Sequence, residues 1–293
     1  MSKRIFVVGS INTDLVISTN QIPNEGETIK GNDFFVAKGG KGANQALASS
    51  KLGGNCLMCG CVGDDSFGKE AVESLKKNGV DVNFVKTIEN TSTGTAVIIL
   101  HNKNNRIIIS GGANEYLSTE SIDSFLENAN EGDIYVTQME YSLDVVGYGL
   151  KKAKEKGMYV VFNPSPVHEN IVPYLSYCDL LIPNETEIEK LGGLDKMLNL
   201  IPTIVVTLGS KGYKIVTRNE EKQYPCLQVD AIDTTAAGDT CLGGIVAKLS
   251  EGCSIEEACE YGSLAASIAC TRIGAQPSIP NKEEIDNIIR KID

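Results

Sequence analysis

The residues best suited to chemistry lie in a late segment, Asp233-Thr234-Thr235-Ala236-Ala237-Gly238-Asp239-Thr240. An apolar series at helical spacing follows it: Leu242, Ile245, Val246 and Leu249. A helix is therefore expected to begin near Gly238, where unpaired N–H groups and a partial positive charge can hold a phosphate. A carboxylate beside a phosphate is repelled, so Asp239 is best explained as a base that takes a proton from a substrate hydroxyl. The alternative is that Asp239 only stabilises the helix N-terminus.

A second polar segment, Gly39-Gly40-Lys41-Gly42-Ala43-Asn44-Gln45, leads into another expected helix. Its glycines permit close approach of a backbone or ligand. Lys41 and Asn44 can hydrogen-bond to substrate hydroxyls, although Lys41 could instead contact phosphate. A tight strand–helix turn without a ligand is the structural alternative.

Two further segments follow expected strands. Asn184-Glu185-Thr186-Glu187 places amide and carboxylate groups where they could order water around Mg²⁺, and its alternative is a helix-capping pattern. Thr207-Leu208-Gly209-Ser210-Lys211-Gly212 contains glycines that could pass close to a nucleotide. Its alternative is a plain hairpin between Val206 and Tyr213.

Three other patterns do not support the chemistry that they suggest. Residues 63–70 nearly match the phosphate loop G-x-x-x-x-G-K-[ST], but Glu70 replaces the hydroxyl residue and two aspartates stand inside the loop. No G-x-G-x-x-G follows the first strand, which argues against a dinucleotide dehydrogenase. Cys56, Cys59 and Cys61 have no second Cys/His pair at zinc spacing, so we expect buried strand residues.

Strands and helices alternate along most of the chain. Strands are expected at 5–8, 56–62, 134–138, 159–162, 180–182 and 204–208, and helices at 43–52, 67–78, 144–156, 240–249, 255–271 and 282–292. This alternation predicts an α/β fold with three α/β/α layers around a mostly parallel sheet. Polar residues that follow the strands should converge on one cleft: Asn12, Asp14, Glu140, Asn184, Glu187, Gly209 and Gly212.

Residues 1–293 are expected to form one domain with a small inserted sheet. Residues 12–36 and 94–112 contain short β-prone runs without an intervening helix, and we interpret them as strands of a small antiparallel sheet inserted into the larger domain.

Composition limits the classes of partner. The formal net charge is −11 and no basic stripe is present, which argues against nucleic-acid binding. No apolar run reaches about 18 residues, so no membrane association is expected. The nine cysteines are an odd number in a long chain, which favours a reducing, cytoplasmic compartment.

Taken together, these segments resemble the ribokinase branch of the PfkB-type sugar kinase family. The likeness covers essentially the whole chain. Its signatures match Gly9-Ser10-Ile11-Asn12-Thr13-Asp14, the segment 39–45, the segment 233–240 and the tail Gly274-Ala275-Gln276-Pro277-Ser278-Ile279-Pro280.

The resemblance implies transfer of the γ-phosphoryl group of ATP to the 5-hydroxyl of ribose. Asp239 would be the base, and the N–H groups of Ala236, Ala237, Gly238 and Asp239 would form an anion hole. The sugar would be held by Asn12, Asp14, Gly40, Lys41, Asn44 and Glu140. The nucleotide would contact Asn184, Glu187, Thr207, Gly209, Gly212, Gly238 and Ser263.

The resemblance also implies two ions and a partner. Mg²⁺ would accompany ATP, with Glu187 contributing through water. A K⁺ activator would be held by Asp233, Thr235, Ala269, Arg272, Gly274 and Ser278, several of them through backbone carbonyls. The small sheet would act as a lid and as the contact of a homodimer.

The chain departs from the family pattern in two places. Residues 191–202 form a shortened stretch expected near the nucleotide, and Cys241 replaces a common aromatic residue. Three alternatives remain: a kinase of 2-deoxyribose, fructose or a nucleoside with the same mechanism, a dehydrogenase, and a non-catalytic sugar-binding protein. The presence of both Gly238 and Asp239 argues against the last.

Overall fold

The computed structural model describes residues 2–101 and 104–292. Nine strands form the larger sheet in the order β13-β12-β11-β10-β9-β8-β1-β4-β5. The bounds are β1 (Arg4–Val8), β4 (Asn55–Gly63), β5 (Asp81–Ile88), β8 (Ile134–Thr137), β9 (Tyr159–Phe162), β10 (Leu180–Leu181), β11 (Thr203–Thr207), β12 (Tyr213–Thr217) and β13 (Glu221–Tyr224). The run from β11 to β5 is parallel, whereas β12 and β13 add an antiparallel edge.

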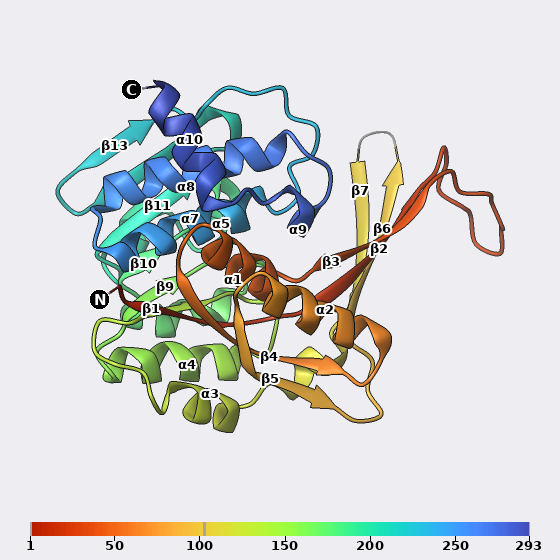
Figure 1. The fold of residues 1–293 in the computed structure, drawn as a ribbon, viewed down its shortest axis with the longest axis horizontal. Coiled ribbons are helices and arrows are strands. Elements are labelled where there is room, and N and C mark those ends of the chain that lie inside the picture. Colours follow the sequence, from red (N-terminus) through yellow and green to blue (C-terminus); the bar gives the residue numbers. More distant parts are fainter. Residues whose placement is uncertain (1, 102–103, 293) are drawn as a thin grey trace.

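Helices cover both faces of this sheet (Figure 1). The alternation in β1 shows why: Ile5 and Val7 belong to one core, and Phe6 and Val8 to the other. The first core is closed by α1 (Lys41–Lys51), α2 (Ser66–Lys77), α7 (Ala237–Glu251), α8 (Ile255–Cys270) and α10 (Lys282–Ile292). The second is closed by α3 (Thr119–Leu126), α4 (Leu143–Glu155), α5 (Glu185–Lys190), α6 (Leu194–Leu198) and the 3₁₀ segment η2 (Glu169–Tyr177). The predicted three-layer fold is confirmed.

The smaller sheet projects from the body of the molecule (Figure 1) and has the order β3-β2-β6-β7. Its strands are β2 (Asn12–Ser18), β3 (Phe34–Gly39), β6 (Gly94–His101) and β7 (Asn104–Ser110). The outer pairings are antiparallel as expected, but the central β2–β6 pairing is parallel. Residues 102 and 103, which belong to the predicted insertion 94–112, lie outside the described residues.

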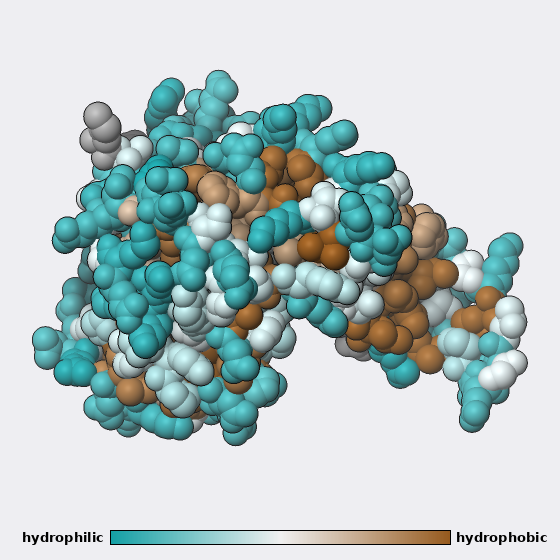
Figure 2. All heavy atoms as spheres, turned by 90° about the horizontal axis from the view of Figure 1, so that it is seen from below, coloured by the Kyte–Doolittle hydropathy of each residue, from teal (hydrophilic) through white to brown (hydrophobic). Residues whose placement is uncertain are grey.

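The two faces of the smaller sheet differ. The strand registers place Asp14 on the face of Ala37, Ala96 and Ile109, because directly paired residues share a face. On the opposite face one cross-strand row consists of apolar side chains: Val36, Leu15, Val97 and Ile108. Hydrophobic residues gather on this projecting part of the surface (Figure 2), and Ile108 is 68% exposed.

Helix α7 lies unusually close to α1. A side chain at Gly243 would bring its Cβ within 2.4 Å of the Ala48 Cβ, so glycine is required where the two helices meet. This contact holds the first turn of α7 beside the first turn of α1. The two glycine-rich segments singled out in the sequence are thereby brought together.

The cysteine cluster and the shortened stretch both have plain structural roles. Cys59 and Cys61 point into the core opposite to that of Cys56, as alternation along β4 requires. Burial raises the pKa of Cys59 to about 12 and that of Cys61 to about 11, so these thiols stay neutral. The shortened stretch contains the short helix α6, whose Met197 is fully buried.

Among the described helices, none is long and apolar enough to cross a membrane.

Candidate active site

The first turn of α7 presents free backbone donors. Ala236, just before the helix, adopts a left-handed conformation with φ 58°, which turns the preceding loop into the helix. The Ala237 N–H donates to the Thr234 carbonyl at 3.2 Å. Within the described residues the N–H groups of Ala236, Gly238 and Asp239 have no hydrogen-bond partner. Three of the four N–H groups expected in the anion hole are therefore free, whereas that of Ala237 is engaged.

The Asp239 carboxylate is held by two amide side chains of α1. Asn44 Nδ2 donates to Oδ2 at 3.0 Å, and Gln45 Nε2 donates to Oδ1 at 2.9 Å. Asp239 is 6% exposed, yet it lines a cavity together with Lys41. The carboxylate thus lines the same cavity as Lys41 and is hydrogen-bonded to Asn44, and it is not sealed in the core.

The glycine-rich turn before α1 sets the position of the other polar groups. Gly40 has φ 87°, and a Cβ there would approach the Asn12 backbone nitrogen to 2.7 Å and the Ser10 carbonyl to 2.8 Å. Only glycine allows this contact between the start of α1 and the end of β1. Glu140 then bridges both segments, because its Oε2 accepts from the Lys41 N–H at 3.0 Å and from the Ser10 hydroxyl at 2.5 Å.

Two charged side chains near Glu140 are uncommitted. Among the described residues, neither the Asp14 carboxylate nor the Lys41 ammonium has a side-chain hydrogen-bond partner. Burial, and then the charge of Glu140, raise the pKa of Asp14 to about 6. Burial alone would lower the pKa of Lys41, but the carboxylates of Asp239, Glu140 and Glu187 outweigh it and raise that pKa. A partly buried carboxylate and ammonium group without partners are suited to binding the hydroxyl groups of a ligand.

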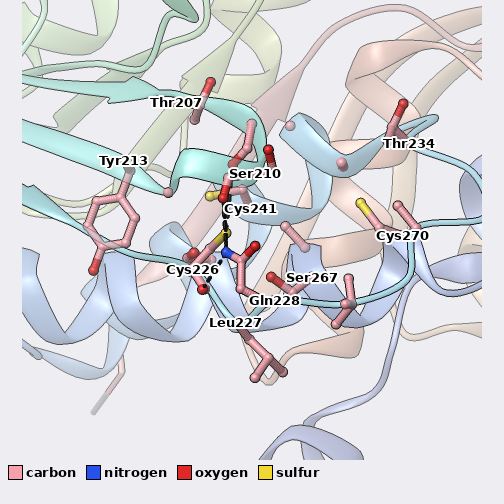
Figure 3. A pocket seen from close by; sticks show the side chains of 18 residues that line it. Thr207, Ser210, Tyr213, Cys226, Leu227, Gln228, Thr234, Cys241, Ser267 and Cys270 are labelled. Atoms are coloured by element: carbon pink, nitrogen blue, oxygen red, sulfur yellow. Dashed lines mark hydrogen bonds between the residues drawn. The ribbon is translucent and has the colours of Figure 1, made fainter.

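Two cavities meet at the start of α7. A polar cavity of about 250 Å³ is lined by Lys41, Asn184, Glu187 and Asp239, among others. A mostly apolar cavity of about 230 Å³ lies beyond it (Figure 3), and both are lined by Thr207, Thr234, Ala237 and Gly238. A single elongated ligand could therefore lie in the apolar cavity and reach Asp239 through the polar one.

The predicted nucleotide residues divide between these cavities. Thr207, Gly209, Gly212 and Ser263 line the apolar cavity. The segment 207–212 is also the hairpin connection between β11 and β12, so the structural alternative holds at the same time. Asn184 and Glu187 line the polar cavity, and they also form a capping box at the start of α5. The shortened stretch 191–202 contributes no residue to the apolar cavity, whereas the buried Cys241 does.

The residues expected to hold a monovalent cation come from three neighbouring segments: Asp233 and Thr235 precede α7, Ala269 lies near the end of α8, and Arg272, Gly274 and Ser278 follow α8. Asp233 Oδ1 accepts from the Thr235 N–H at 2.9 Å, and Oδ2 accepts from the Gly274 N–H at 2.8 Å. These hydrogen bonds outweigh burial and lower the pKa of Asp233. Arg272 donates to the Ser278 carbonyl and pairs with Glu284, which compensates its charge, and its N–H donates to the Ala269 carbonyl. A carboxylate with nearby backbone carbonyls is a donor set that suits K⁺.

Sequence reasoning missed several polar residues of the site. Asn114, in the 3₁₀ segment η1 (Gly112–Tyr116), donates to Asn12 Oδ1 at 2.8 Å and accepts from the Ile11 N–H at 2.9 Å. Gln45 and Gln138 form a buried amide pair, with 2.7 Å between Gln138 Nε2 and Gln45 Oε1. Nothing in the local sequence around residue 114 indicates a site, and Gln138 is marked only by its place at the end of an expected strand, two residues before Glu140. Gln45 carries a clearer signal, its place directly after Asn44.

The apolar cavity also has lining residues that the sequence did not indicate. Cys226, Leu227 and Gln228 come from the segment after β13, and Ser267 and Cys270 from α8 (Figure 3). Gln228 Nε2 donates to the Ser210 carbonyl at 3.0 Å, which ties this segment to the hairpin. Gln228 lies only five residues before Asp233, whereas Ser267 and Cys270 are far from the glycine-rich motifs in sequence and reach the cavity only through folding.

Comparison with known proteins identifies the family. Residues 2–282 match the sequence profile of the pfkB family carbohydrate kinases. The chain is 37% identical to ribokinase of Haemophilus influenzae, with 97% of each chain covered, and 36% identical to deoxyribokinase of Salmonella typhi, with 97% and 98% covered.

Its structure is also similar to that of Arabidopsis thaliana ribokinase complexed with ribose and ATP. The TM-score is 0.86 at 30% identity, and 99% of each chain is covered. The crevice that joins the Asp239 carboxylate to unpaired helix N–H groups is thus found in a chain that belongs to the pfkB family of ATP-dependent carbohydrate kinases.

Proposed function

We propose that this sugar kinase phosphorylates the 5-hydroxyl of ribose, with Asp239 as the base. One observation carries the proposal: the Asp239 carboxylate accepts hydrogen bonds from α1, the helix that carries Lys41 and Asn44, while the Asp239 N–H is free at the start of α7. The same residue therefore connects the place for an alcohol with the place for a phosphate. The relative solved with ribose and ATP supports both ligands.

The free polar atoms on the sugar side match the hydroxyls of a pentose. Asn44 Oδ1 is buried without a partner and Asp14 is uncommitted, so both can accept from hydroxyls. Asn12 Oδ1 is occupied by Asn114, which leaves its Nδ2 as a donor. Gly40, Lys41 and Glu140 complete the set. Such a pocket discriminates strongly against a sugar that lacks one of the hydroxyls.

The transfer step follows from these positions. Asp239 accepts the proton of the 5-hydroxyl, and the oxygen attacks the γ-phosphorus of ATP as the bond to the β-phosphate oxygen breaks. The free N–H groups of Ala236, Gly238 and Asp239 stabilise the negative charge that develops on the phosphoryl oxygens. The Lys41 ammonium, which is influenced by the charges of Asp239 and Glu187, adds a positive charge to this region.

Mg²⁺ bound to ATP would neutralise phosphate charge. Glu187 Oε2 is used in the capping box and accepts from the Asn184 N–H at 2.8 Å, while no hydrogen bond to Oε1 is present among the described residues. That oxygen can hold a metal-bound water. Asn184 lies beside it in the same cavity.

A K⁺ ion between the loops at 233–235 and 269–278 would stabilise the loop that leads into the anion hole. Asp233 already joins these loops through Thr235 and Gly274. Turnover is expected to be higher in potassium chloride than in sodium chloride at equal ionic strength. Equal rates in the two salts would contradict the assignment.

The exposed apolar row Val36, Leu15, Val97 and Ile108 would pair with the same row of a second copy. It lies on the face opposite to Asp14, so a homodimer would leave the substrate face of the lid accessible. Ile108→Glu is expected to give a monomer by light scattering, while Glu73→Lys, on α2, leaves the mass unchanged. A wild-type monomer at micromolar concentration would contradict this proposal.

The direct test is ATP-dependent phosphorylation over ribose, 2-deoxyribose, fructose and nucleosides. We expect the highest kcat/KM for ribose. A preference for 2-deoxyribose, the substrate class named for one relative, would overturn the substrate assignment but not the mechanism. Asp239→Asn should still bind ribose and lose activity by about 10³-fold or more. Near-normal turnover of that variant would overturn the mechanism.

A further inference from the structure

Gln45 is a fully buried amide with both ends engaged. Its Nε2 donates to Asp239 Oδ1 at 2.9 Å, and its Oε1 accepts from Gln138 Nε2 at 2.7 Å. An ionised carboxylate can only accept, so the nitrogen end must face Asp239. The orientation of the amide is therefore fixed by its partners, and Gln45 cannot exchange donor for acceptor without losing both contacts.

Gln138 holds the far end of this amide chain. It follows β8 directly and is fully buried. A Cβ on Gly9 would lie 2.1 Å from Gln138 Oε1, so the amide fits against bare backbone at the end of β1. The chain Gln138–Gln45–Asp239 thus connects the centre of the large sheet to the first turn of α7.

Gln45 differs from its neighbour Asn44 in what it can contact. Asn44 also donates to Asp239, but its buried Oδ1 has no hydrogen-bond partner among the described residues. Neither side chain lines either cavity, but both ends of Gln45 are engaged, and the second acceptor of its Nε2 among the described residues is Asn163 Oδ1 at 3.3 Å. Asn44 can serve both substrate and base, whereas Gln45 can act only through Asp239.

We propose that Gln45 is the positioning residue of the base: it orients the Asp239 carboxylate toward the sugar hydroxyl and stabilises its ionised form, with Gln138 fixing the amide. The proposal rests on the role proposed for Asp239. It assigns to Gln45 an effect on the chemical step and none on substrate binding. A hydrogen bond to a charged group supports an expected loss of about 10- to 100-fold in kcat.

The test compares Gln45→Met, which keeps the shape but cannot donate, with Ser49→Ala on the same helix. Ser49 is buried and its hydroxyl donates to the Gln45 carbonyl at 2.7 Å, so the control perturbs α1 without touching Asp239. Gln45→Met should lower kcat by the stated factor while KM for ribose and ATP, and ribose affinity by calorimetry, change less than threefold. Ser49→Ala should lower stability and leave kcat unchanged.

Gln45→Glu gives a pH signature that a merely structural role would not produce. The carboxyl group introduced at position 45 can donate to Asp239 when it is protonated, as the amide does. When this carboxyl group loses its proton, the hydrogen bond is lost and two carboxylates face each other. The activity of Gln45→Glu should therefore fall with rising pH over a range in which the activities of the wild type and of Gln45→Met stay constant. Gln138→Met should lower kcat less than Gln45→Met does, and it serves if Gln45→Met fails to fold.

Asp239→Asn is measured in the same series to separate the two proposals. If Asp239→Asn is inactive while Gln45→Met keeps kcat within threefold of wild type, the positioning role is refuted and the base assignment stands. If Asp239→Asn is active, the proposed mechanism fails. Equal losses of kcat in Gln45→Met and Ser49→Ala would also refute the positioning role.

Discussion

Replacing Asp14 by asparagine should make the free protein more stable and the enzyme worse. The Asp14 carboxylate is half-buried, has no hydrogen-bond partner among the described residues, and lies over Gly39, where a Cβ would be 2.4 Å from Oδ2. Its pKa is raised from 3.8 to about 6, first by burial and then by Glu140. At neutral pH Asp14 is therefore ionised in the folded protein, and burial of this charge lowers the free energy of unfolding.

The sign of the effect on stability follows from proton binding. Between about pH 4 and 6 the folded state keeps the Asp14 proton and the unfolded state has lost it. The contribution of Asp14 to stability is therefore lost as pH rises through this window, unlike that of a carboxylate with a lowered pKa. The shift corresponds to at most about 3 kcal/mol, and partial exposure reduces this to about 1–2 kcal/mol.

Asp14→Asn should accordingly raise Tm by about 2–3 °C at pH 7.5 and by nothing near pH 4, because a chain of this length has an unfolding entropy of about 0.6 kcal/mol/K. The measurement is thermal and urea unfolding of both proteins across this range, with Asp195→Asn, on α6, as a matched control. KM for ribose should rise by about 10-fold or more, because an acceptor for the sugar hydroxyls is lost. A destabilised variant, or one with unchanged ribose KM, would refute the reasoning.

Three further predictions concern the neighbouring residues. Asn114→Leu should raise KM for the sugar by about 10-fold, because Asn12 loses the bond that fixes its amide; unchanged steady-state kinetics would contradict this. Gly238→Ala should leave Tm unchanged, because a Cβ there meets nothing within 4 Å. Its methyl group would, however, occupy space proposed for the phosphates and raise KM for ATP by about 10-fold. Normal ATP kinetics would exclude a phosphate contact at Gly238. Cys226 should be alkylated by N-ethylmaleimide more slowly when ADP is bound, because it lines the apolar cavity; peptide mass spectrometry that shows equal rates would place the nucleotide elsewhere.

Much of the fold could be predicted from local patterns because the large sheet is mostly parallel. Its central strands are buried on both faces and form short apolar runs in the sequence, and the helices between them end at glycines such as Gly79 and Gly157. The edge strand β5 was missed, because its partly exposed residues lack a clear apolar run. The parallel β2–β6 pairing was also missed, since it joins strands from two separate insertions.

The site divides in the same way. Local sequence sufficed to propose Asp239, Lys41 and Asn44 as site residues, because small residues before a helix, and polar residues after glycines, are typical of turns that bind ligands. By itself the sequence determined, to within about three residues, where α1, α2, α4, α7, α8 and α10 begin and which polar side chains those starts carry, but α3 was missed. Only the tertiary structure decided that α1 and α7 meet at Gly243, that Gln45, itself held by Gln138, donates to the Asp239 carboxylate, and that Asn114 holds Asn12. The physical reason is that a helix start is encoded within one turn of chain, whereas a hydrogen bond between residues far apart in the sequence exists only after the core has packed.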